Sequence, residues 1–482
     1  MTSTVNEPPP TEYKQCSTCG FATPATRTRC HNCWNRLDPE TPILDAEHAQ
    51  ELVARQEVIL AGQESARQAR RRRRRLILGG IAFLFVAWFG WWVYRSFIYT
   101  PPPVPEASNP TLQMLSGPDA WATSGGDVLE SRAIDLPVPL DGEVAWSLNL
   151  GGAETPLVAD AERVYAVTEN KLIALDIEDG GVAWEYELQG APFGAPSLAG
   201  DRLYVALRAG QLLALDAATG EEIYYSLNTG TRFGTSPIVV DGYAYVFGIG
   251  AVVAFDAEDG EVLWSTENRA GVAFTNPVVT DDHIAGVTGD EVLAFNRSNG
   301  AQTYFYEFAR AFPYSTVARD GVVYVSSRRY TVAFDEDSGR PWWELWRATW
   351  NQFWLWGMAP DVPQPERLWQ NNDPPQADGF PAAISGDLLV VASNEGELQA
   401  LRLADGSEAW RVTPSGVDTV VGGPLATRDG VLVPFEDRLA LFDSSTGALL
   451  AERPFEGVLA DAILTSRGLF VLAEDGTLRA IR

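Results

Sequence analysis

The chain has 482 residues, with 36 Lys and Arg against 64 Asp and Glu and a formal net charge of −28 at pH 7. Residues 1–100 carry 13 basic and 9 acidic side chains, whereas the remainder carries 23 and 55, so the negative charge belongs to the larger, C-terminal part. A body this acidic repels polyanions, which excludes nucleic acid and anionic membrane surfaces as its partners.

All four cysteines of the chain lie near its N-terminus. Residues 1–13 are polar and proline-rich and are expected to form a disordered tip. Residues 14–37 hold two CxxC pairs ten residues apart, a spacing typical of one tetrahedral Zn²⁺ site. The expected metal ligands are Cys16, Cys19, Cys30 and Cys33. Four thiolates complete the shell, so we predict a structural Zn²⁺ that supplies most of the folding energy of this segment and leaves no open position for catalysis.

Two alternatives for this segment stay open: His31 replaces one cysteine as a ligand, or the four thiols hold no metal. The sequence CSTCGF resembles the first knuckle of the small zinc-ribbon family. The second knuckle departs from that pattern, because Trp34 stands where glycine is usual. This departure leaves the geometry of the second turn open, but not the identity of the ligands.

A long helical segment follows the cysteines. Residues 45–75 have helix-forming composition, begin at the capping residue Asp45 and end in six arginines, and we expect a cytoplasmic juxtamembrane helix there. Residues 76–98 begin with 19 uncharged residues, which as a helix span about 28 Å, close to the hydrocarbon thickness of a bilayer. We predict one transmembrane helix, with a buried core helix as the alternative. Because basic residues flank the cytoplasmic side of a span, the N-terminus is predicted to be cytoplasmic and the acidic body extracytoplasmic.

Residues 99–140 separate this helix from the rest of the chain. Six prolines lie between residues 100 and 118, a composition typical of an extended, semi-rigid segment. We expect a stalk and linker that holds the body off the membrane. Residues 119–135 lie outside the repeats described next, so their loss is expected to matter less than the loss of residues 141–150.

From residue 141 the chain repeats one motif with a period near 40 residues. An apolar strand ends in a polar residue, a glycine follows four residues later, and an aromatic side chain follows after four more. The strand ends are Asp176, Asp216, Asp256, Asn296, Asp335, Arg402, Asp443 and Arg482, and the aromatic residues are Trp184, Tyr224, Trp264, Tyr304, Trp343 and Trp410, with Ala451 as the exception. Period-two alternation and glycine-rich turns indicate β-strands, and the period is that of a propeller blade.

The two ends of the repeat region complement each other. The last strand end, Arg482, lacks its glycine and aromatic residue, and the missing half stands ahead of the first repeat as Gly142 and Trp146. Pairing these halves closes a ring and removes a free sheet edge. The predicted fold is therefore all-β: an eight-bladed β-propeller of four-stranded antiparallel blades over residues 141–482, preceded by the zinc ribbon and the transmembrane helix.

The fifth repeat is longer than the others, because Asp335 and Arg402 are 67 residues apart. The extra segment, residues 344–380, lies in a tryptophan-rich region. Four tryptophans recur every four residues, at Trp342, Trp346, Trp350 and Trp354. They indicate a helix that either packs on the rim of the propeller or exposes an aromatic platform to a partner.

The pattern LxALDxxTGxxxW resembles the pyrroloquinoline-quinone-like propeller repeat. That family includes the quinoprotein alcohol dehydrogenases and the non-catalytic propeller lipoprotein of the outer-membrane barrel assembly machinery. The enzymes, as the family pattern implies, use Ca²⁺, a catalytic carboxylate and commonly adjacent cysteines beside the quinone. This chain has no cysteine beyond Cys33 and one histidine, His283, in its body. We therefore expect no bound quinone and assign no catalytic residue.

The function favoured by the sequence is non-enzymatic. We expect a membrane-anchored extracytoplasmic propeller that acts as a scaffold for proteins of the cell envelope, which it contacts through the propeller faces or the tryptophan-rich insertion. Two alternatives remain: a sensor that couples an external ligand to a cytoplasmic partner of the ribbon, and a quinoprotein-type dehydrogenase.

Overall fold

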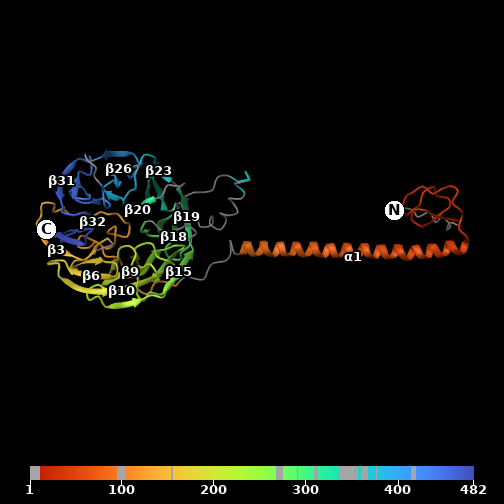
Figure 1. The fold of residues 1–482 in the computed structure, drawn as a ribbon, viewed down its shortest axis with the longest axis horizontal. Helices are drawn as coiled ribbons and strands as arrows, with labels where there is room; N and C mark the ends of the chain where they lie inside the picture. Colours follow the sequence, from red (N-terminus) through yellow and green to blue (C-terminus); the bar gives the residue numbers. More distant parts are fainter. Residues whose placement is uncertain are drawn as a thin grey trace. The chain divides into compact units, whose positions relative to one another are not determined.

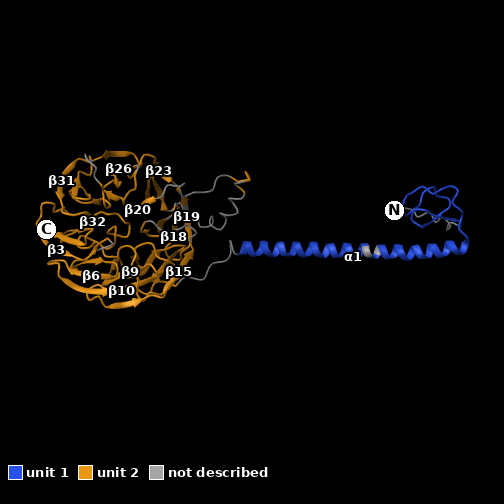
Figure 2. Ribbon diagram, in the orientation of Figure 1, with its two compact units in different colours: residues 1–100 blue, residues 101–482 orange. Residues whose placement is uncertain are grey.

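The computed structural model of the chain describes residues 11–94, 105–152, 156–267, 275–289, 291–308, 313–336, 353, 356–359, 367–375, 377–413 and 419–482. The chain divides into two compact units, residues 1–100 and 101–482 (Figure 2). Each unit has its own fold.

The first unit combines a small hairpin with one long helix. Strand β1 (Tyr13–Gln15) pairs antiparallel with β2 (Ala22–Pro24), and helix α1 spans Ala46–Val93 without a break. Asp45 caps the helix as predicted, since its Oδ1 accepts a hydrogen bond of 2.8 Å from the backbone N–H of His48. Among the described residues, α1 is the one helix long and apolar enough to cross a membrane, and its apolar part is not buried, unlike that of a core helix.

The described strands of the second unit form eight four-stranded antiparallel sheets, arranged as the blades of a propeller (Figure 1). Blade 1 contains β4 (Val158–Ala159), β5 (Arg163–Val167), β6 (Lys171–Asp176) and β7 (Val182–Glu187); blade 2 contains β8 (Ser197–Ala199), β9 (Arg202–Leu207), β10 (Gln211–Asp216) and β11 (Glu222–Tyr225); blade 3 contains β12 (Ile238–Val240), β13 (Tyr243–Phe247), β14 (Ala251–Asp256) and β15 (Val262–Glu267); blade 4 contains β16 (Val278–Val279), β17 (His283–Thr288), β18 (Glu291–Asn296) and β19 (Gln302–Glu307). Blade 5 contains β20 (Pro313–Arg319), β21 (Val322–Ser327), β22 (Thr331–Asp335) and β23 (Arg367–Asn371); blade 6 contains β24 (Ala383–Ser385), β25 (Leu388–Ala392), β26 (Leu398–Arg402) and β27 (Glu408–Val412); blade 7 contains β28 (Leu425–Ala426), β29 (Val431–Pro434), β30 (Arg438–Phe442) and β31 (Leu449–Pro454); blade 8 contains β32 (Leu459–Thr465), β33 (Gly468–Ala473), β34 (Thr477–Ile481) and β3 (Val144–Asn149).

The core lies between neighbouring blades. First strands of neighbouring blades, such as β4 and β8 or β24 and β28, contact one another, so the first strand of each blade lines the propeller axis. The middle strands are covered on both faces; all six residues of β14 are buried. Burial on both faces explains why these strands read as apolar runs in the sequence.

The ring closes as the sequence predicts. Strand β3 pairs antiparallel with β34, with Leu148 opposite Leu478 and Trp146 opposite Ala480. The first strand of the propeller in chain order is therefore the fourth strand of blade 8 in space. This pairing covers the edge of the C-terminal strand and confirms the eight-blade count.

The repeated glycine and aromatic residue meet at the junction between blades. Gly180 has a left-handed φ of 74°, and a Cβ built on it lies 2.6 Å from the ring of Trp146 in the preceding blade, so only glycine fits. The indole Nε1 of Trp146 donates to the carbonyl of Ile177 at 3.0 Å. Trp184, Trp264, Trp369 and Trp410 make the same bond to the next blade.

Arginine takes over this role where the aromatic series breaks. Ala451 stands at the aromatic position of blade 7, and the guanidinium of Arg453, two residues on, donates to the carbonyls of Leu140 and Gly142 at 2.7 and 2.6 Å. The junction between blades 7 and 8 is thus held by charge-assisted hydrogen bonds instead of an indole ring.

The fifth blade corrects one prediction. The spacing placed its aromatic residue at Trp343, but Trp369 of β23 lies opposite Ala333 of β22 and donates to the carbonyl of Leu403 at 2.7 Å. The insertion therefore falls between the third and fourth strands, and β23 belongs to the blade. Trp343 and the predicted helical tryptophans, Trp342, Trp346, Trp350 and Trp354, lie outside the described residues.

The predicted stalk over residues 99–140 is wrong for residues 105–140, which we call the axial segment. Residues 95–104 lie outside the described part of the chain. Within the axial segment, Trp121 is 1% exposed and forms a β-bridge with Ala159, and Ala133 forms a parallel bridge with Ala426. Proline-rich composition predicted an extended backbone, but not the propeller surface on which that backbone packs.

Candidate functional site

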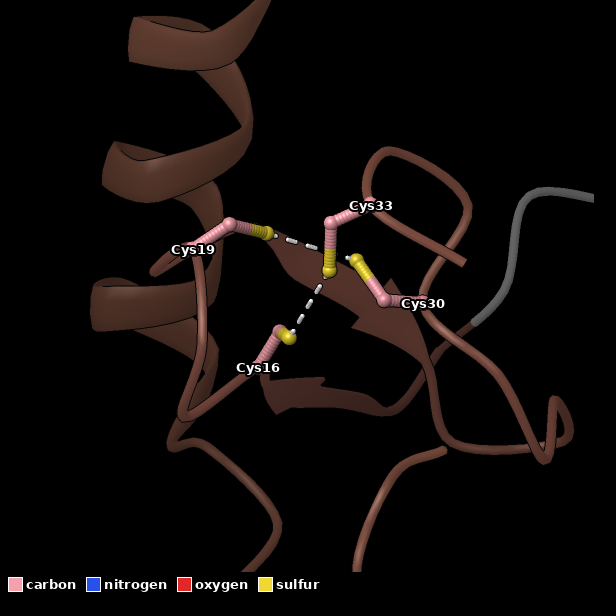
Figure 3. A group of neighbouring side chains, drawn as sticks. All are labelled: Cys16, Cys19, Cys30 and Cys33. Atoms are coloured by element: carbon pink, nitrogen blue, oxygen red, sulfur yellow. Dashed lines mark hydrogen bonds between the residues drawn. The ribbon is translucent and has the colours of Figure 1, made fainter. Parts of the chain in front are cut away.

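Four cysteine side chains converge in the first unit (Figure 3). Cys16 and Cys19 lie between β1 and β2, and Cys30 and Cys33 lie in the second CxxC turn. The sulfurs of Cys16 and Cys33 are 3.6 Å apart, those of Cys19 and Cys30 are 3.5 Å apart, and all four lie within 4.8 Å of one another. Tetrahedral zinc with Zn–S bonds of about 2.3 Å requires sulfur separations of about 3.8 Å, so the arrangement fits one such ion.

The two knuckles have the same turn geometry although their sequences differ. Gly20 follows the first pair with φ 73°, and its N–H donates to the carbonyl of Cys16 at 2.8 Å. Trp34 follows the second pair with φ 61°, and its N–H donates to the carbonyl of Cys30 at 3.0 Å. Trp34 thus adopts the left-handed backbone that the first knuckle assigns to glycine, which answers the question left open by the sequence.

The thiols of Cys30 and Cys33 have pKa values shifted in opposite directions. Burial raises the pKa of Cys30, but hydrogen bonds from Thr23 Oγ1 and from nearby backbone N–H groups outweigh it and lower the pKa to about 6. The N–H of Asn35 lowers the pKa of Cys33, but desolvation and the three neighbouring sulfurs outweigh it and raise the pKa to about 12. Four thiolates at this spacing repel one another, so their full ionisation requires a bound cation.

His31 lies outside this group of sulfurs. Its Nδ1 is hydrogen-bonded to Thr23 Oγ1 at 3.2 Å, and Thr23 in turn contacts the sulfur of Cys30 at 3.5 Å. His31 therefore reaches the sulfurs only through the Thr23 hydroxyl. The candidate metal centre consists of the four cysteines.

A second candidate site lies at the propeller axis. Backbone hydrogen bonds connect the axial segment to the first strands of blades 1–7 and to the first turn of blade 8. These bonds join Met114 N to Val239 O, Leu115 N to Leu198 O, Trp121 N to Ala159 O, Val279 N to Val128 O, Ala318 N to Leu129 O, Ile384 N to Ser131 O, Ala426 N to Arg132 O and Ser466 N to Pro118 O. Because the first strands line the axis, these bonds place the axial segment against the innermost strand of one blade after another.

The axial segment carries buried charges. Glu130 and Arg132 are 4% and 6% exposed, and both have left-handed backbones, with φ 53° and 47°. Burial raises the pKa of Glu130 to about 7, against the hydrogen bond from the Ser124 hydroxyl. Burial likewise raises the pKa of Asp127, against hydrogen bonds from Ser131. Glu130 Oε1 has no hydrogen-bond partner among the described residues. Strained backbone and buried, unpaired polar atoms both cost free energy, and they often gather at functional sites. We therefore treat this loop as a candidate site.

A cavity of about 240 Å³ adjoins this loop, and its lining includes Ser124, Arg132, Gly422, Gly423 and Asp461. Arg132 donates to the carbonyls of Ser124, Gly423 and Pro424, which fixes its guanidinium in place. Burial raises the pKa of Asp461, against the attraction of Arg132.

The sequence predicted that the four cysteines lie together, as the structure places them, but it did not predict the axial site. A CxxC pair predicts two neighbouring thiols directly, because its short spacing holds the two sulfurs on one turn. The axial residues lie in a stretch without period, so no pattern indicated their burial. The one available signal was local: Trp121 close to the glycine pair Gly125–Gly126, an unusual combination for a solvated linker. The ring of Trp121 indeed packs against Gly126.

Comparison with known proteins agrees with this architecture. BamB from Moraxella catarrhalis is 14% identical with a TM-score of 0.56, covering 70% of this chain and 98% of its own. The computationally designed Ika8 protein is 12% identical with a TM-score of 0.57, over 70% and 99% of the two chains. Quinohemoprotein alcohol dehydrogenase from Comamonas testosteroni is 16% identical with a TM-score of 0.55, over 75% and 80%. No curated protein matches the sequence.

These structural likenesses, at such low identity, show the fold alone. The family match reaches further, because the family described as outer membrane protein assembly factor BamB matches residues 132–345 and 344–450, more than half of the chain. The repeat pattern and the closed eight-bladed ring agree with that match. The chain belongs to the family of the outer membrane protein assembly factor BamB.

Proposed function

We propose that this chain is a single-pass membrane protein whose propeller acts outside the cytoplasm as a non-enzymatic scaffold for proteins of the cell envelope. In this proposal α1 is the anchor, the N-terminus is cytoplasmic, and the four cysteines hold one structural Zn²⁺. Membership of a family named for outer membrane protein assembly supports a role in protein interaction at the envelope.

One observation carries the choice of a scaffold over an enzyme. The axial segment bonds to all eight blades next to the axis, and the cavity beside Arg132 measures about 240 Å³. Small-molecule sites in proteins usually measure about 300–1,000 Å³. The faces and the rim of the propeller therefore offer more room for recognition than its axis does, and such surfaces suit protein partners.

Photo-crosslinking in intact cells tests the scaffold. A photoreactive phenylalanine analogue is placed at exposed apolar positions of the propeller, namely Val182, Leu227, Ile249 and Leu449, with the buried Leu203 as the control. We expect discrete crosslinks to envelope proteins from at least one exposed position and none from Leu203. The absence of any protein crosslink would contradict the scaffold. A quinone absorbance after addition of pyrroloquinoline quinone and Ca²⁺, together with alcohol oxidation, would instead support the dehydrogenase alternative.

Cysteine labelling in intact cells tests the topology. Ser108 is exposed at the start of the axial segment, and Ser65 is exposed on α1 before the apolar stretch. With a membrane-impermeant reagent we expect Ser108→Cys to be labelled before lysis and Ser65→Cys only after it. The reverse order would place the propeller in the cytoplasm.

A further inference from the structure

A groove of about 320 Å³ separates the cysteine-bearing segment from the first turns of α1, within the first unit. Its lining includes Arg27 and His31 from the segment and Val53, Gln56, Glu57 and Leu60 from the helix. Polar and apolar side chains thus face the same groove, which is a composition suited to a peptide rather than to lipid.

Gln56 is the unusual member of this lining. Its side chain belongs to a residue only 7% exposed, yet the amide Nε2 has no hydrogen-bond partner among the described residues. An unpaired buried amide costs about 1–3 kcal/mol, and native proteins keep few of them. Because Gln56 lines the groove, an acceptor entering from outside, such as a peptide carbonyl, is placed to satisfy this donor.

The charge of the segment favours an acidic ligand. Residues 14–37 contain one lysine and three arginines and no Asp or Glu. Arg27 lines the groove, is exposed, and has no carboxylate partner within the described residues. Glu57 faces the same groove, and its charge disfavours the continuous phosphate row of a nucleic acid while tolerating a peptide with spaced carboxylates.

The position of the groove along α1 excludes the membrane as its ligand. Gln56 precedes Leu76, where the uncharged apolar stretch begins, by 20 residues of uninterrupted helix, which corresponds to about 30 Å. A helix that crosses the bilayer therefore holds this groove well away from the headgroups, and its ligand approaches from the aqueous phase.

We propose that the groove between the cysteine-bearing segment and α1 binds an acidic peptide segment of a partner protein. A backbone carbonyl of that peptide accepts from Gln56 Nε2, a carboxylate pairs with Arg27, and an apolar side chain packs on Val53 and Leu60. The site lies at the opposite end of α1 from its apolar stretch and gives the first unit a binding role of its own. It does not depend on the scaffold proposed for the propeller, because the peptide would bind whichever side of the membrane the groove faces.

Peptide display on the full-length, zinc-loaded chain in nanodiscs tests this site. A phage library of random 12-residue peptides is selected on the wild type, and labelled synthetic copies of the selected peptides are titrated by fluorescence anisotropy. We expect the selected peptides to be rich in Asp and Glu. We expect Gln56→Leu and Arg27→Gln to weaken their binding about fivefold or more, as the loss of one hydrogen bond or one charge-assisted bond predicts.

The matched control is Arg29→Gln, which removes the same charge from an exposed arginine outside the groove and should change binding less than twofold. Gln56→Leu also removes a buried unpaired donor, so it should leave the zinc content intact and not lower the stability of the unit. Selection of no peptide, selection of peptides without excess acid, equal weakening by all three substitutions, or tighter binding of a 12-nucleotide single-stranded RNA would each overturn the proposal.

Discussion

At the scale of single residues, left-handed backbone outside glycine marks positions where the fold overrides local preference. Trp34, Glu130 and Arg132 have φ of 61°, 53° and 47°. Each such conformation costs about 1–2 kcal/mol for a residue with a Cβ. The cost is borne where surrounding contacts leave no alternative: the sulfur cluster fixes the turn at Trp34, and the first strands of the propeller fix the backbone around Glu130 and Arg132.

The second knuckle provides the first test at this scale. Trp34→Gly relieves the left-handed strain at an exposed side chain and should stabilise the metal-loaded ribbon by about 1 kcal/mol. Gly20→Ala is the matched control with the opposite sign, because it introduces the same strain at φ 73° without a close contact. The measurement is zinc retention against a competing chelator. Faster zinc loss from Trp34→Gly would show that the indole itself supports the ribbon.

Glu130 predicts a pH dependence. Burial raises its pKa from 4.5 to about 7. Between pH 4.5 and pH 7 the folded protein therefore keeps a proton on Glu130 that the unfolded chain has released. The free energy of unfolding is therefore not reduced by Glu130 below about pH 4.5. It falls by up to about 3 kcal/mol as the pH rises to 7 and the buried carboxyl ionises. Glu130→Gln mimics the protonated form and should be more stable than the wild type at pH 8 and equal to it at pH 4.5.

Chemical denaturation of both proteins at the two pH values isolates this effect. Asp127 and Asp461 also have raised pKa values and impose the same direction on both proteins, so only the difference between wild type and Glu130→Gln reports on Glu130. Equal differences at both pH values would mean that the carboxyl is solvated and titrates normally.

At the scale of elements, the axial segment is held by the blades and not by structure of its own. It contains no named strand before β3, yet its backbone groups pair with the first strands of seven blades. This pairing gives the backbone N–H and C=O groups at the axis protein partners. In an open, solvated channel the same groups would bind water. The blades in turn are joined by the aromatic and glycine contacts, and by Arg453 at the junction where that contact is missing.

Trp121 tests whether the axial segment contributes to the stability of the propeller. Its side chain is 1% exposed, packs on Gly126 and lies under the guanidinium of Arg132. Trp121→Ala should cost about 3–5 kcal/mol of unfolding free energy, as for other buried tryptophans. The control Leu227→Ala removes an apolar side chain that is 85% exposed and should cost less than about 0.5 kcal/mol. Equal melting of Trp121→Ala and wild type would restore the view of this region as a dispensable linker.

At the scale of the whole molecule, the sequence predicted what recurs and missed what occurs once. The period of the strand ends and the split repeat at Trp146 were sufficient for eight blades and their closure. The burial of the axial segment was not predicted, because it depends on eight blades that meet only after folding. The role of Trp369 as the aromatic residue of blade 5 was not predicted, because the insertion separates it from Asp335 and breaks the spacing. The clustering of the four cysteines could be predicted because it depends on spacing within a short, local segment.

A disulfide across the closing strands tests the ring itself. Ser147 of β3 lies opposite Arg479 of β34 in the antiparallel register, so their Cα atoms are within the reach of a disulfide. In residues 105–482, which contain no native cysteine, Ser147→Cys with Arg479→Cys should form this bond on mild oxidation. The bond closes a loop that spans nearly the whole propeller, and chain entropy predicts about 6 kcal/mol of added stability. The matched control pairs Ser147→Cys with Thr477→Cys, which lies opposite Asn149 on the same face of β34, beyond disulfide reach. Oxidation of the control pair as readily as the test pair would show that β3 slides along β34 or that the ring stands open, and the closed propeller would then have to be abandoned.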